Sequence, residues 1–384
     1  MNIGIDAHAA EREGHGNGTY IRNVIRELVR IESPHTFSLY AIDPGHAFYK
    51  ELSGDPRFRI RAVGARSPLV RIPFALARAT RRDALDVLHV QYIAPPVHRG
   101  RLVATIHDLG FLSVPRTFSR AFVLRSRLLV RRTARRADTI ITGSAHARDH
   151  IARAYGLNPA KIEVVPYGVE ESYRARLTDA AIREVLAPLG VRHPYMLSVG
   201  RLNPRKNLAA LVRAFAGLKS RLRLLHTLVI AGKEDFGAAA VLKEIRGAGA
   251  ADIVFTGYVA DRDLPALYQG ADIFLYPSLF EGVGLPVLEA MASGAPVITS
   301  DRSSLPEIAG GAALIVDPTD EVQISAAMER ILDDRGLRED CVRRGLARSA
   351  EFCWEATAKK TLEIYEHVCS LTHFRQFVFR SSCK

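Results

Sequence analysis

Two carboxylates, Glu281 and Glu289, are separated by seven residues in the stretch YPSLFEGVGLPVLEAMASGAPVITS, which runs from position 276 to position 300. We expect a strand, a glycine loop, a short helix and a second strand here, because Pro286 suits the first turn of a helix and Gly294 the left-handed residue just past its end. Glu281 then lies on the loop and Glu289 in the first helical turn. Both carboxylates can face one cleft, where they would bind adjacent hydroxyl groups of a sugar or a ribose.

Two cations follow another candidate strand, in the phrase Gly200-Arg201-Leu202-Asn203-Pro204-Arg205-Lys206-Asn207. We expect Arg201 on the loop and Lys206 at the start of the next helix. Fixed cations at the end of a strand stabilise a nucleoside diphosphate, above all as it departs. No Asp-x-Asp motif follows a strand where it could bind a metal, because Asp261-Arg262-Asp263 precedes a helix and is interpreted as its cap. We therefore expect the positive side chains to take the place of a divalent metal ion.

A glycine loop, Gly14-His15-Gly16-Asn17-Gly18, comes after the first candidate strand and leads into an amphipathic helix. Such a loop presents backbone N–H groups to phosphate. A plain turn and a dinucleotide site remain open from this motif alone, although no acidic residue ends the second strand as NAD binding would require. His107, beside Asp108 at the end of a further strand, is placed to contact a bound sugar.

These motifs need elements that hold them at one edge of a sheet. Short β-rich runs alternate with helix-like segments along the chain, which predicts an α/β fold of two Rossmann-like domains, each a parallel sheet with crossover helices. A polar stretch from Gly168 to Pro194 separates the two series of strands. Ligands bind outside the carboxyl ends of such strands, so the cleft between the domains is the expected site. The predicted strands are Asn2–Asp6, Ser38–Ile42, Arg59–Val63, Val87–Val90, Val103–His107, Thr139–Thr142 and Ile162–Val165, then Tyr195–Val199, Thr227–Ala231, Ile253–Thr256, Ile273–Tyr276, Val297–Ser300 and Ala313–Val316.

Length and composition agree with this organisation. At 384 residues the chain suits two domains, and its 48% hydrophobic and 24% charged residues are ordinary for a globular protein. We expect neither a transmembrane segment nor a signal peptide. The net charge of +12 favours acidic partners. The four cysteines all lie near the C-terminus and show no spacing typical of metal ligands: Cys341, Cys353, Cys369 and Cys383. Reduced cysteines in a cytoplasmic compartment are the simplest interpretation.

The stretch around Glu281, the Gly-Arg-x4-Lys-Asn phrase and the glycine loop together resemble the retaining, nucleotide-sugar-dependent glycosyltransferases of family 4 (glycosyl transferases group 1). The resemblance covers nearly the whole chain. It implies the GT-B fold, with an acceptor-side domain over residues 1–170 and a nucleotide-sugar-binding domain over residues 171–352. Residues 353–384 would form a helix that crosses back to the first domain, followed by a basic tail.

The resemblance also implies a role for each motif. Arg201 and Lys206 would bind the donor phosphates, Glu281 the hydroxyls of the transferred sugar and Glu289 the ribose diol, while His107 would lie over the sugar. His107, Glu281, Arg201 and Lys206 are thus the expected catalytic residues. No covalent nucleophile is expected, since the departing diphosphate would assist attack on the same face of the sugar. The remaining donor-binding residues are Gly16, Gly18, Gly257, Tyr258, Gly282, Val283, Gly284 and Leu285.

The implied reaction moves a hexose, with GDP-mannose as the leading donor, to a hydroxyl group of a saccharide or lipid-linked acceptor in polysaccharide, lipopolysaccharide or glycolipid assembly. No metal or other cofactor is expected. Three alternatives stay open: a sugar-nucleotide epimerase of similar fold, a nucleotide-sugar-binding protein without activity, and a nucleic-acid-binding protein. Two residues depart from the family's pattern, Tyr167 in place of Asn and Val283 in place of Phe, so no donor contact is assigned to Tyr167 and Val283 is expected to alter sugar selectivity.

Residues Arg120 to Arg136 form an expected helix that is basic on one side and apolar on the other, and the upstream run from Val70 to Arg82 adds four arginines. Three interpretations fit: a nucleic-acid patch, a peripheral contact with the anionic inner face of the cell membrane, and a core helix with solvated arginines. Membrane contact fits a lipid-linked acceptor better. No recognised nucleic-acid module accompanies the arginines, and nucleic-acid binding is not expected.

Overall fold

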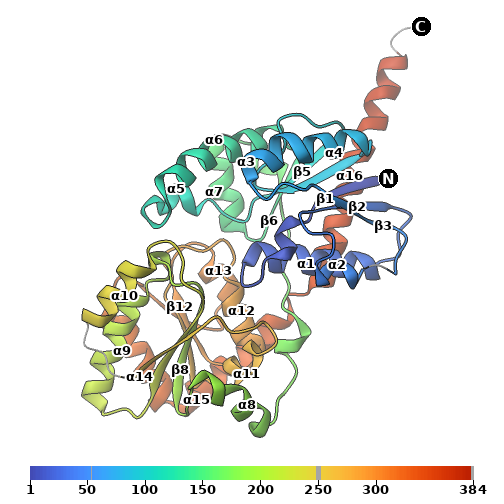
Figure 1. Ribbon diagram of the computed structural model, residues 1–384. Coiled ribbons are helices and arrows are strands. Elements are labelled where there is room, and N and C mark those ends of the chain that lie inside the picture. The colour runs from blue at the N-terminus through green and yellow to red at the C-terminus, as the bar shows by residue number, and fades with distance from the viewer. Residues whose placement is uncertain (53, 248–251, 382–384) are drawn as a thin grey trace.

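The computed structural model describes residues 1–52, 54–247 and 252–381, with side chains through residue 370. Within these residues the strands form two parallel sheets, of seven and six strands, which Figure 1 shows at the centres of two domains. The first sheet has the order β3-β2-β1-β4-β5-β6-β7 and the second the order β10-β9-β8-β11-β12-β13. The prediction of an α/β fold with two parallel sheets is confirmed.

Every predicted strand is present, with bounds that agree with the prediction to within two residues. The first sheet contains β1 (Asn2–Asp6), β2 (Thr36–Ala41), β3 (Phe58–Ala62), β4 (Val87–Gln91), β5 (Arg101–Thr105), β6 (Thr139–Thr142) and β7 (Ile162–Val164). The second contains β8 (Tyr195–Val199), β9 (Thr227–Ala231), β10 (Ile253–Gly257), β11 (Ile273–Tyr276), β12 (Val297–Ser300) and β13 (Leu314–Val316).

Helices connect most consecutive strands, although none lies between β4 and β5. No helix in the described part of the chain is long and apolar enough to cross a membrane. The first domain contains α1 (Gly16–Arg30), α2 (Ala47–Lys50), α3 (Pro68–Val70), α4 (Ala77–Arg82), α5 (Gly110–Ser113), α6 (Arg120–Arg136) and α7 (Ala145–Tyr155). The second contains α8 (Asp179–Leu186), α9 (Leu208–Leu222), α10 (Ala238–Gly247), α11 (Leu264–Gln269), α12 (Leu285–Ala292), α13 (Leu305–Ala309), α14 (Glu321–Asp333) and α15 (Arg335–Ala350), and α16 (Trp354–Ser381) follows.

Helices cover both faces of the first sheet. The crossovers β1–α1–β2 and β5–α6–β6 run in opposite directions along the strand order, so right-handed connections place α1 and α6 on opposite faces. Helices α1 and α16 contribute to one hydrophobic cluster. Helices α6 and α7 and the turn Arg71–Leu76 between α3 and α4 contribute to another. The outer surfaces of α3 and α6 therefore belong to the same face of the domain.

The segment between β11 and β12 forms a loop, a helix and a turn, as predicted. Pro286 is in the first turn of α12, Gly284 precedes the helix at φ +86°, and Gly294 follows it at φ +80°. Gly284 adopts this left-handed conformation at little cost because it lacks a Cβ, and the helix therefore begins at Leu285. Glu289 then lies beyond the first turn, so its predicted place in that turn was wrong.

Two residues that precede helices differ in their capping. Ser144 caps α7, because its Oγ accepts a hydrogen bond from the backbone N–H of Ala147 (3.2 Å). Asp263 precedes α11, but its backbone is already helical (φ −95°, ψ −18°) and its side chain makes no capping bond. The interpretation of Asp261–Asp263 as a side-chain cap was wrong, and Asp261 instead pairs with Arg22 of α1 (3.2 Å).

Helix α16 runs back beside the first domain, as Figure 1 shows, and packs against α1. The hydroxyl of Tyr365 lies 2.5 Å from Nδ1 of His89 in β4, and Trp354 stacks on Tyr167 with ring centroids 6.1 Å apart. The crossing expected of this helix is therefore seen in its contacts. The domain limits at residues 170 and 352 stay a prediction, and the predicted basic tail lies outside the described side chains.

Tyr365→Ala is expected to lower the free energy of unfolding by about 3–5 kcal/mol, because it removes a fully buried aromatic ring and leaves His89 without its partner. Glu363→Ala, an exposed change on the same helix, should alter it by less than about 0.5 kcal/mol. Denaturation followed by the fluorescence of the single tryptophan, Trp354, measures both. Equal effects of the two variants would contradict the burial of α16 in the first domain.

Candidate active site

The carboxyl ends of the two sheets face each other, and groups from both domains meet there. Ser144, after β6, donates from Oγ to the carbonyl oxygen of Gly282, after β11 (2.8 Å). The backbone N–H groups of Ala145 and His146, at the start of α7, donate to the carboxylate of Glu307 in α13 (2.7 and 3.0 Å). An acidic side chain from one domain thus satisfies the unpaired donors of a helix in the other.

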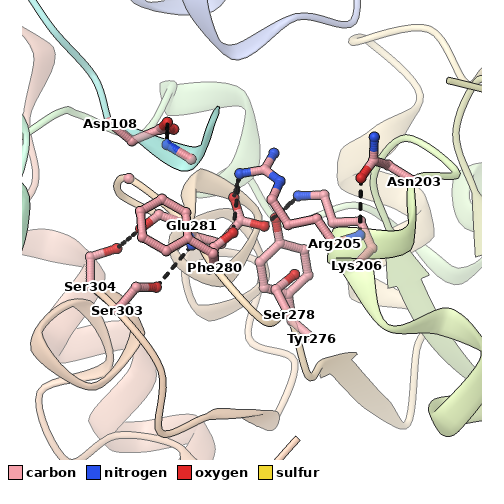
Figure 2. Close-up of polar contacts among 12 residues, drawn as sticks. Asp108, Asn203, Arg205, Lys206, Tyr276, Ser278, Phe280, Glu281, Ser303 and Ser304 are labelled. Atoms are coloured by element: carbon pink, nitrogen blue, oxygen red, sulfur yellow. Dashed lines mark hydrogen bonds and ion pairs between the residues drawn. The ribbon is translucent and has the colours of Figure 1, made fainter. Parts of the chain in front are cut away.

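Glu281 lies at the centre of a polar cluster, shown in Figure 2. Its Oε1 is 2.6 Å from Nζ of Lys206, and its Oε2 is 3.4 Å from Nη1 of Arg205. Lys206 also donates to the hydroxyl of Tyr276 (2.5 Å), and Arg205 to the carbonyl oxygen of Phe280 (3.0 Å). Glu281 is only 6% exposed, so this ion pair is largely buried. The structure thus brings together two of the predicted site residues, Lys206 and Glu281.

The backbone of Glu281 is held as firmly as its side chain. Its N–H donates to Oγ of Ser303 (2.8 Å), and its carbonyl oxygen accepts from Oγ of Ser304 (3.0 Å). Burial alone would raise the pKa of Glu281, but Arg205 and Lys206 hold that pKa below its ordinary value. The carboxylate is therefore ionised at neutral pH. Asp108 also acts on Arg205 and Lys206 and favours their charged forms, while burial lowers the pKa of Lys206.

Arg201 contacts the glycine loop of the opposite domain. Its Nη2 donates to Nε2 of His15 (3.0 Å), and its Nη1 is 3.2 Å from a carboxylate oxygen of Asp235. Burial lowers the pKa of His15 to about 4, with further lowering by Arg201 and Arg12, so a neutral imidazole accepts this bond. Nε of Arg201 is buried and has no partner in the described structure. The arginine thus keeps one N–H group uncommitted.

The glycines of the predicted donor site have different surroundings. Helix α1 begins at Gly16, where an added Cβ would meet nothing within 4 Å, whereas a Cβ at Gly18 would lie 2.5 Å from a backbone carbonyl oxygen. Close packing therefore requires glycine at position 18. In the second domain Gly257 has φ +68°, and the hydroxyl of Tyr258 donates to Oε2 of Glu13, which precedes the glycine loop (3.0 Å).

His107 is fixed by hydrogen bonds at both ring nitrogens. Nδ1 lies 2.6 Å from the hydroxyl of Tyr167, and Nε2 lies 2.8 Å from Oε1 of Gln91. Burial lowers the pKa of His107 to about 3, so the ring is neutral at physiological pH. Tyr167, which departs from the family's pattern, thus positions the histidine. The backbone of His107 lies against Gly282, where an added Cβ would be 2.5 Å from its carbonyl oxygen.

The rest of the loop after Glu281 forms packing contacts. Val283 is 5% exposed, and a Cβ added at Gly143 would lie 2.4 Å from its Cγ2. A Cβ added at Gly284 would lie 2.6 Å from Cδ2 of Leu305, and Leu285 opens α12 half-buried. Val283 therefore fills the space that the glycine of the other domain leaves between the two sheets.

Glu289 lies in a different environment from Glu281. Its Oε2 accepts a hydrogen bond from the hydroxyl of Tyr268 (2.8 Å). Burial raises the pKa of Glu289 to about 7, and Glu170 and Asp261 add to this against the opposing effect of Tyr268. In the described structure no hydrogen bond or ion pair links Glu289 to Lys206. The structure therefore brings together Lys206, Glu281 and the loop after it, but not the two glutamates.

Three residues of the site were not nominated from the sequence: Arg205, Tyr276 and Tyr268. Arg205 stands beside Lys206, and Tyr276 ends β11, so adjacency to a predicted residue and position at a strand end were usable signals. Tyr268 reaches Glu289 from α11, 21 residues away along the chain, and no local spacing indicates that contact. Within the described part of the chain, no group of His, Cys, Asp and Glu side chains is placed to hold a metal ion.

Comparisons with known proteins agree with this architecture. Residues 15–173 match the family model Glycosyltransferase Family 4, and residues 187–348 match Glycosyl transferases group 1. The chain is 32% identical to O-antigen chain mannosyltransferase B of Escherichia coli, over 89% of this chain and 92% of that protein. The solved structure of sucrose-phosphate synthase from Thermosynechococcus elongatus gives a TM-score of 0.78 at 20% identity, over 97% of this chain and 100% of that one. HepE of Anabaena, in complex with UDP and glucose, gives 0.74 at 18% identity, over 96% and 100%.

The raised pKa of Glu289 predicts a pH-dependent stability. Between pH 4.5, the ordinary pKa of the group, and about 7, the folded state holds a proton that the unfolded state releases, so this residue lowers the free energy of unfolding as pH rises. Glu289→Gln removes this dependence. Relative to wild type, it should become more stable by up to about 3 kcal/mol between pH 4.5 and pH 8.

Denaturant unfolding at both pH values measures this difference. Glu307→Gln is the matched control, because it makes the same substitution at another carboxylate where the two domains meet, one that accepts hydrogen bonds from the backbone N–H groups of Ala145 and His146. A difference between Glu289→Gln and wild type that stays constant with pH would contradict a protonated Glu289.

Proposed function

Since this chain belongs to glycosyltransferase family 4, the glycosyl transferases group 1 with the GT-B fold, we propose that it transfers mannose from GDP-mannose to a hydroxyl group of a saccharide or lipid-linked acceptor. The name of its Escherichia coli relative, an O-antigen chain mannosyltransferase, supports both the sugar and a role in polysaccharide assembly. The observation that carries the proposal is the buried pairing of Glu281 with Lys206 and Arg205, where the two domains meet.

In this reaction Lys206, Arg205 and Arg201 would stabilise the charge that develops on the departing diphosphate. Glu281 holds two of these cations in place before the donor arrives, so little reorganisation is needed as charge moves. The same carboxylate would orient hydroxyls of the transferred sugar, while Glu289 would bind the ribose diol. His107, neutral and bonded at both nitrogens, would shape the sugar pocket rather than exchange a proton.

We propose that transfer retains the configuration at the anomeric carbon. Glu281 is engaged by two cations, which disfavours it as a nucleophile. The departing diphosphate would therefore accept the proton of the acceptor hydroxyl. The new bond between the acceptor oxygen and the anomeric carbon would form on the face from which the phosphate oxygen leaves. Arginine and lysine side chains would neutralise the phosphates, without a metal ion.

We further propose that the protein works in the cytoplasm, at the inner face of the cell membrane. On α6, Val123 and Val130 are buried in the core, whereas Leu124 and Leu128 are each 65% exposed. Leu69 of α3, on the same face of the domain, is 64% exposed. Apolar side chains interspersed with arginines suit the headgroups of anionic lipids. The exposed arginines of α6 are Arg120, Arg127, Arg131, Arg132, Arg135 and Arg136.

GDP-mannose is expected to raise the melting temperature more than UDP-, ADP- or dTDP-sugars, because a ligand that binds only the folded state stabilises it, by about 2.7 kcal/mol at 100 times its Kd. Lys206→Ala should abolish the shift, and Lys243→Ala, an exposed lysine of α10, should preserve it. A shift with a UDP-sugar alone would overturn the choice of donor within the family.

The product of the same reaction tests the stereochemistry. NMR of the mannosylated acceptor should show the anomeric configuration of the donor. An inverted linkage would contradict retention, and an isomerised donor formed without acceptor would identify an epimerase.

Binding to vesicles tests the membrane contact. The protein should co-sediment with phosphatidylglycerol vesicles at low salt, and the double variant Leu69→Ser/Leu128→Ser should reduce the bound fraction several-fold because it removes exposed apolar area. Leu225→Ser, which changes a leucine that is 82% exposed in the second domain, is the matched control. Equal binding by all three proteins, or preference for an oligonucleotide over vesicles, would contradict the proposal.

A further inference from the structure

A groove lies between the first domain and Phe236 of the second, outside the site described above. It is lined by Pro115, Arg116, Phe118, Arg120, Val123, Leu124, Arg127 and Phe236. The groove therefore has one wall from the start of α6 and the turn before it, and an opposite wall from the loop after β9. A molecule that fills it would contact both domains at once.

The groove adjoins the loop that carries the cations. The side-chain amide of Asn203, between Arg201 and Lys206 in sequence, donates to the carbonyl oxygens of Thr117 (3.3 Å) and Phe236 (3.2 Å). Asp235, next to Phe236, pairs with Arg201. One residue of the cation loop thus ties the two walls together, so the groove leads toward the expected position of the donor diphosphate.

The charges of the groove are of one sign. Arg116, Arg120 and Arg127 are exposed, and none of them forms an ion pair in the described structure. The surrounding sequence from position 109 to position 137 contains no aspartate or glutamate. Three guanidinium groups without carboxylate partners attract a phosphate group, which they bind through paired N–H donors.

The groove is also apolar. Leu124 is 65% exposed and Phe236 is 50% exposed, although each stands opposite the other's domain. Phe118 stacks on Phe122 at the same end of α6, with ring centroids 5.4 Å apart. A free phosphate or a nucleic-acid backbone would satisfy the arginines but leave these side chains in water. A phosphate ester of a long hydrocarbon chain satisfies both.

We propose that this groove binds the lipid phosphate or lipid diphosphate portion of the acceptor. The inference rests on the proposed function, because it places the acceptor of that transfer beside its donor. The arginines bind the phosphate, and Leu124 and Phe236 contact the first part of the hydrocarbon chain. The hydrocarbon chain of the lipid then continues along the exposed side of α6 toward Leu128 and Leu69.

Farnesyl diphosphate, a short and soluble lipid diphosphate, is the probe for this groove. Isothermal titration calorimetry, without detergent and below the micelle concentration, should show binding at least about tenfold tighter than that of inorganic diphosphate. The double variant Arg120→Ala/Arg127→Ala should bind farnesyl diphosphate about tenfold or more weakly than wild type. Arg132→Ala/Arg135→Ala, two exposed arginines of the same helix that do not line the groove, should bind as wild type.

Two further variants locate the probe. Phe236→Ser should weaken the binding of farnesyl diphosphate and leave the binding of inorganic diphosphate unchanged, because the substitution removes only an apolar contact. Lys206→Ala should leave the binding of farnesyl diphosphate unchanged. Loss of binding in Lys206→Ala, with none in Arg120→Ala/Arg127→Ala, would place the probe at the donor site and overturn the inference.

Failure of the groove and failure of the proposed function give different results. If GDP-mannose binds and is turned over while farnesyl diphosphate binds no better than inorganic diphosphate, the groove assignment is wrong and the function stands. If farnesyl diphosphate binds in the groove but GDP-mannose neither binds nor reacts, the groove stands and the proposed donor is wrong.

Discussion

Parallel strands place all their carboxyl ends at one edge of a sheet, and this constraint decides where the chemistry of the molecule lies. Two such edges face each other here, and the contacts between them are made by backbone as well as side chains. Ser144 bonds the backbone of Gly282, and Glu307 accepts the first N–H groups of α7. Ser304 lies close to Glu307 in sequence and donates a hydrogen bond to the carbonyl oxygen of Glu281. The same short segment therefore contacts the other domain and holds the backbone of Glu281.

The polar residues divide the site into two electrostatic environments. Around Glu281 two cations and a carboxylate are buried together, so each depends on the others to avoid an uncompensated charge. Around Glu289 the carboxylate meets a tyrosine hydroxyl and other acids, and its pKa lies near neutral. The first environment suits phosphate and the second suits hydroxyl groups. A nucleoside diphosphate sugar has both kinds of group along one molecule.

Much of this arrangement could be predicted from the sequence, because its signals are local. Alternating strands and helices gave the sheets, and strand-end phrases identified Lys206 and Glu281 before their contact was known. The rest depends on pairs distant in sequence. Tyr167 holds His107 across 60 positions, and Glu307 reaches α7 across more than a hundred, so no spacing rule indicates either. The wrong placement of Glu289 in the first turn of α12 has a local cause. The left-handed conformation of Gly284 lets the helix start at Leu285, before Pro286.

The return of α16 to the first domain has a consequence for the order in which the protein is made. Trp354 and Tyr365 complete the first domain's core, yet they follow the whole second sheet along the chain. At elongation rates of about 5–20 residues per second, the ribosome needs roughly 10–40 s to pass from β7 to α16. During that time the surface of Tyr20 and Tyr167 that Trp354 later covers stays open. The nascent first domain therefore offers an apolar surface to chaperones until its last helix arrives.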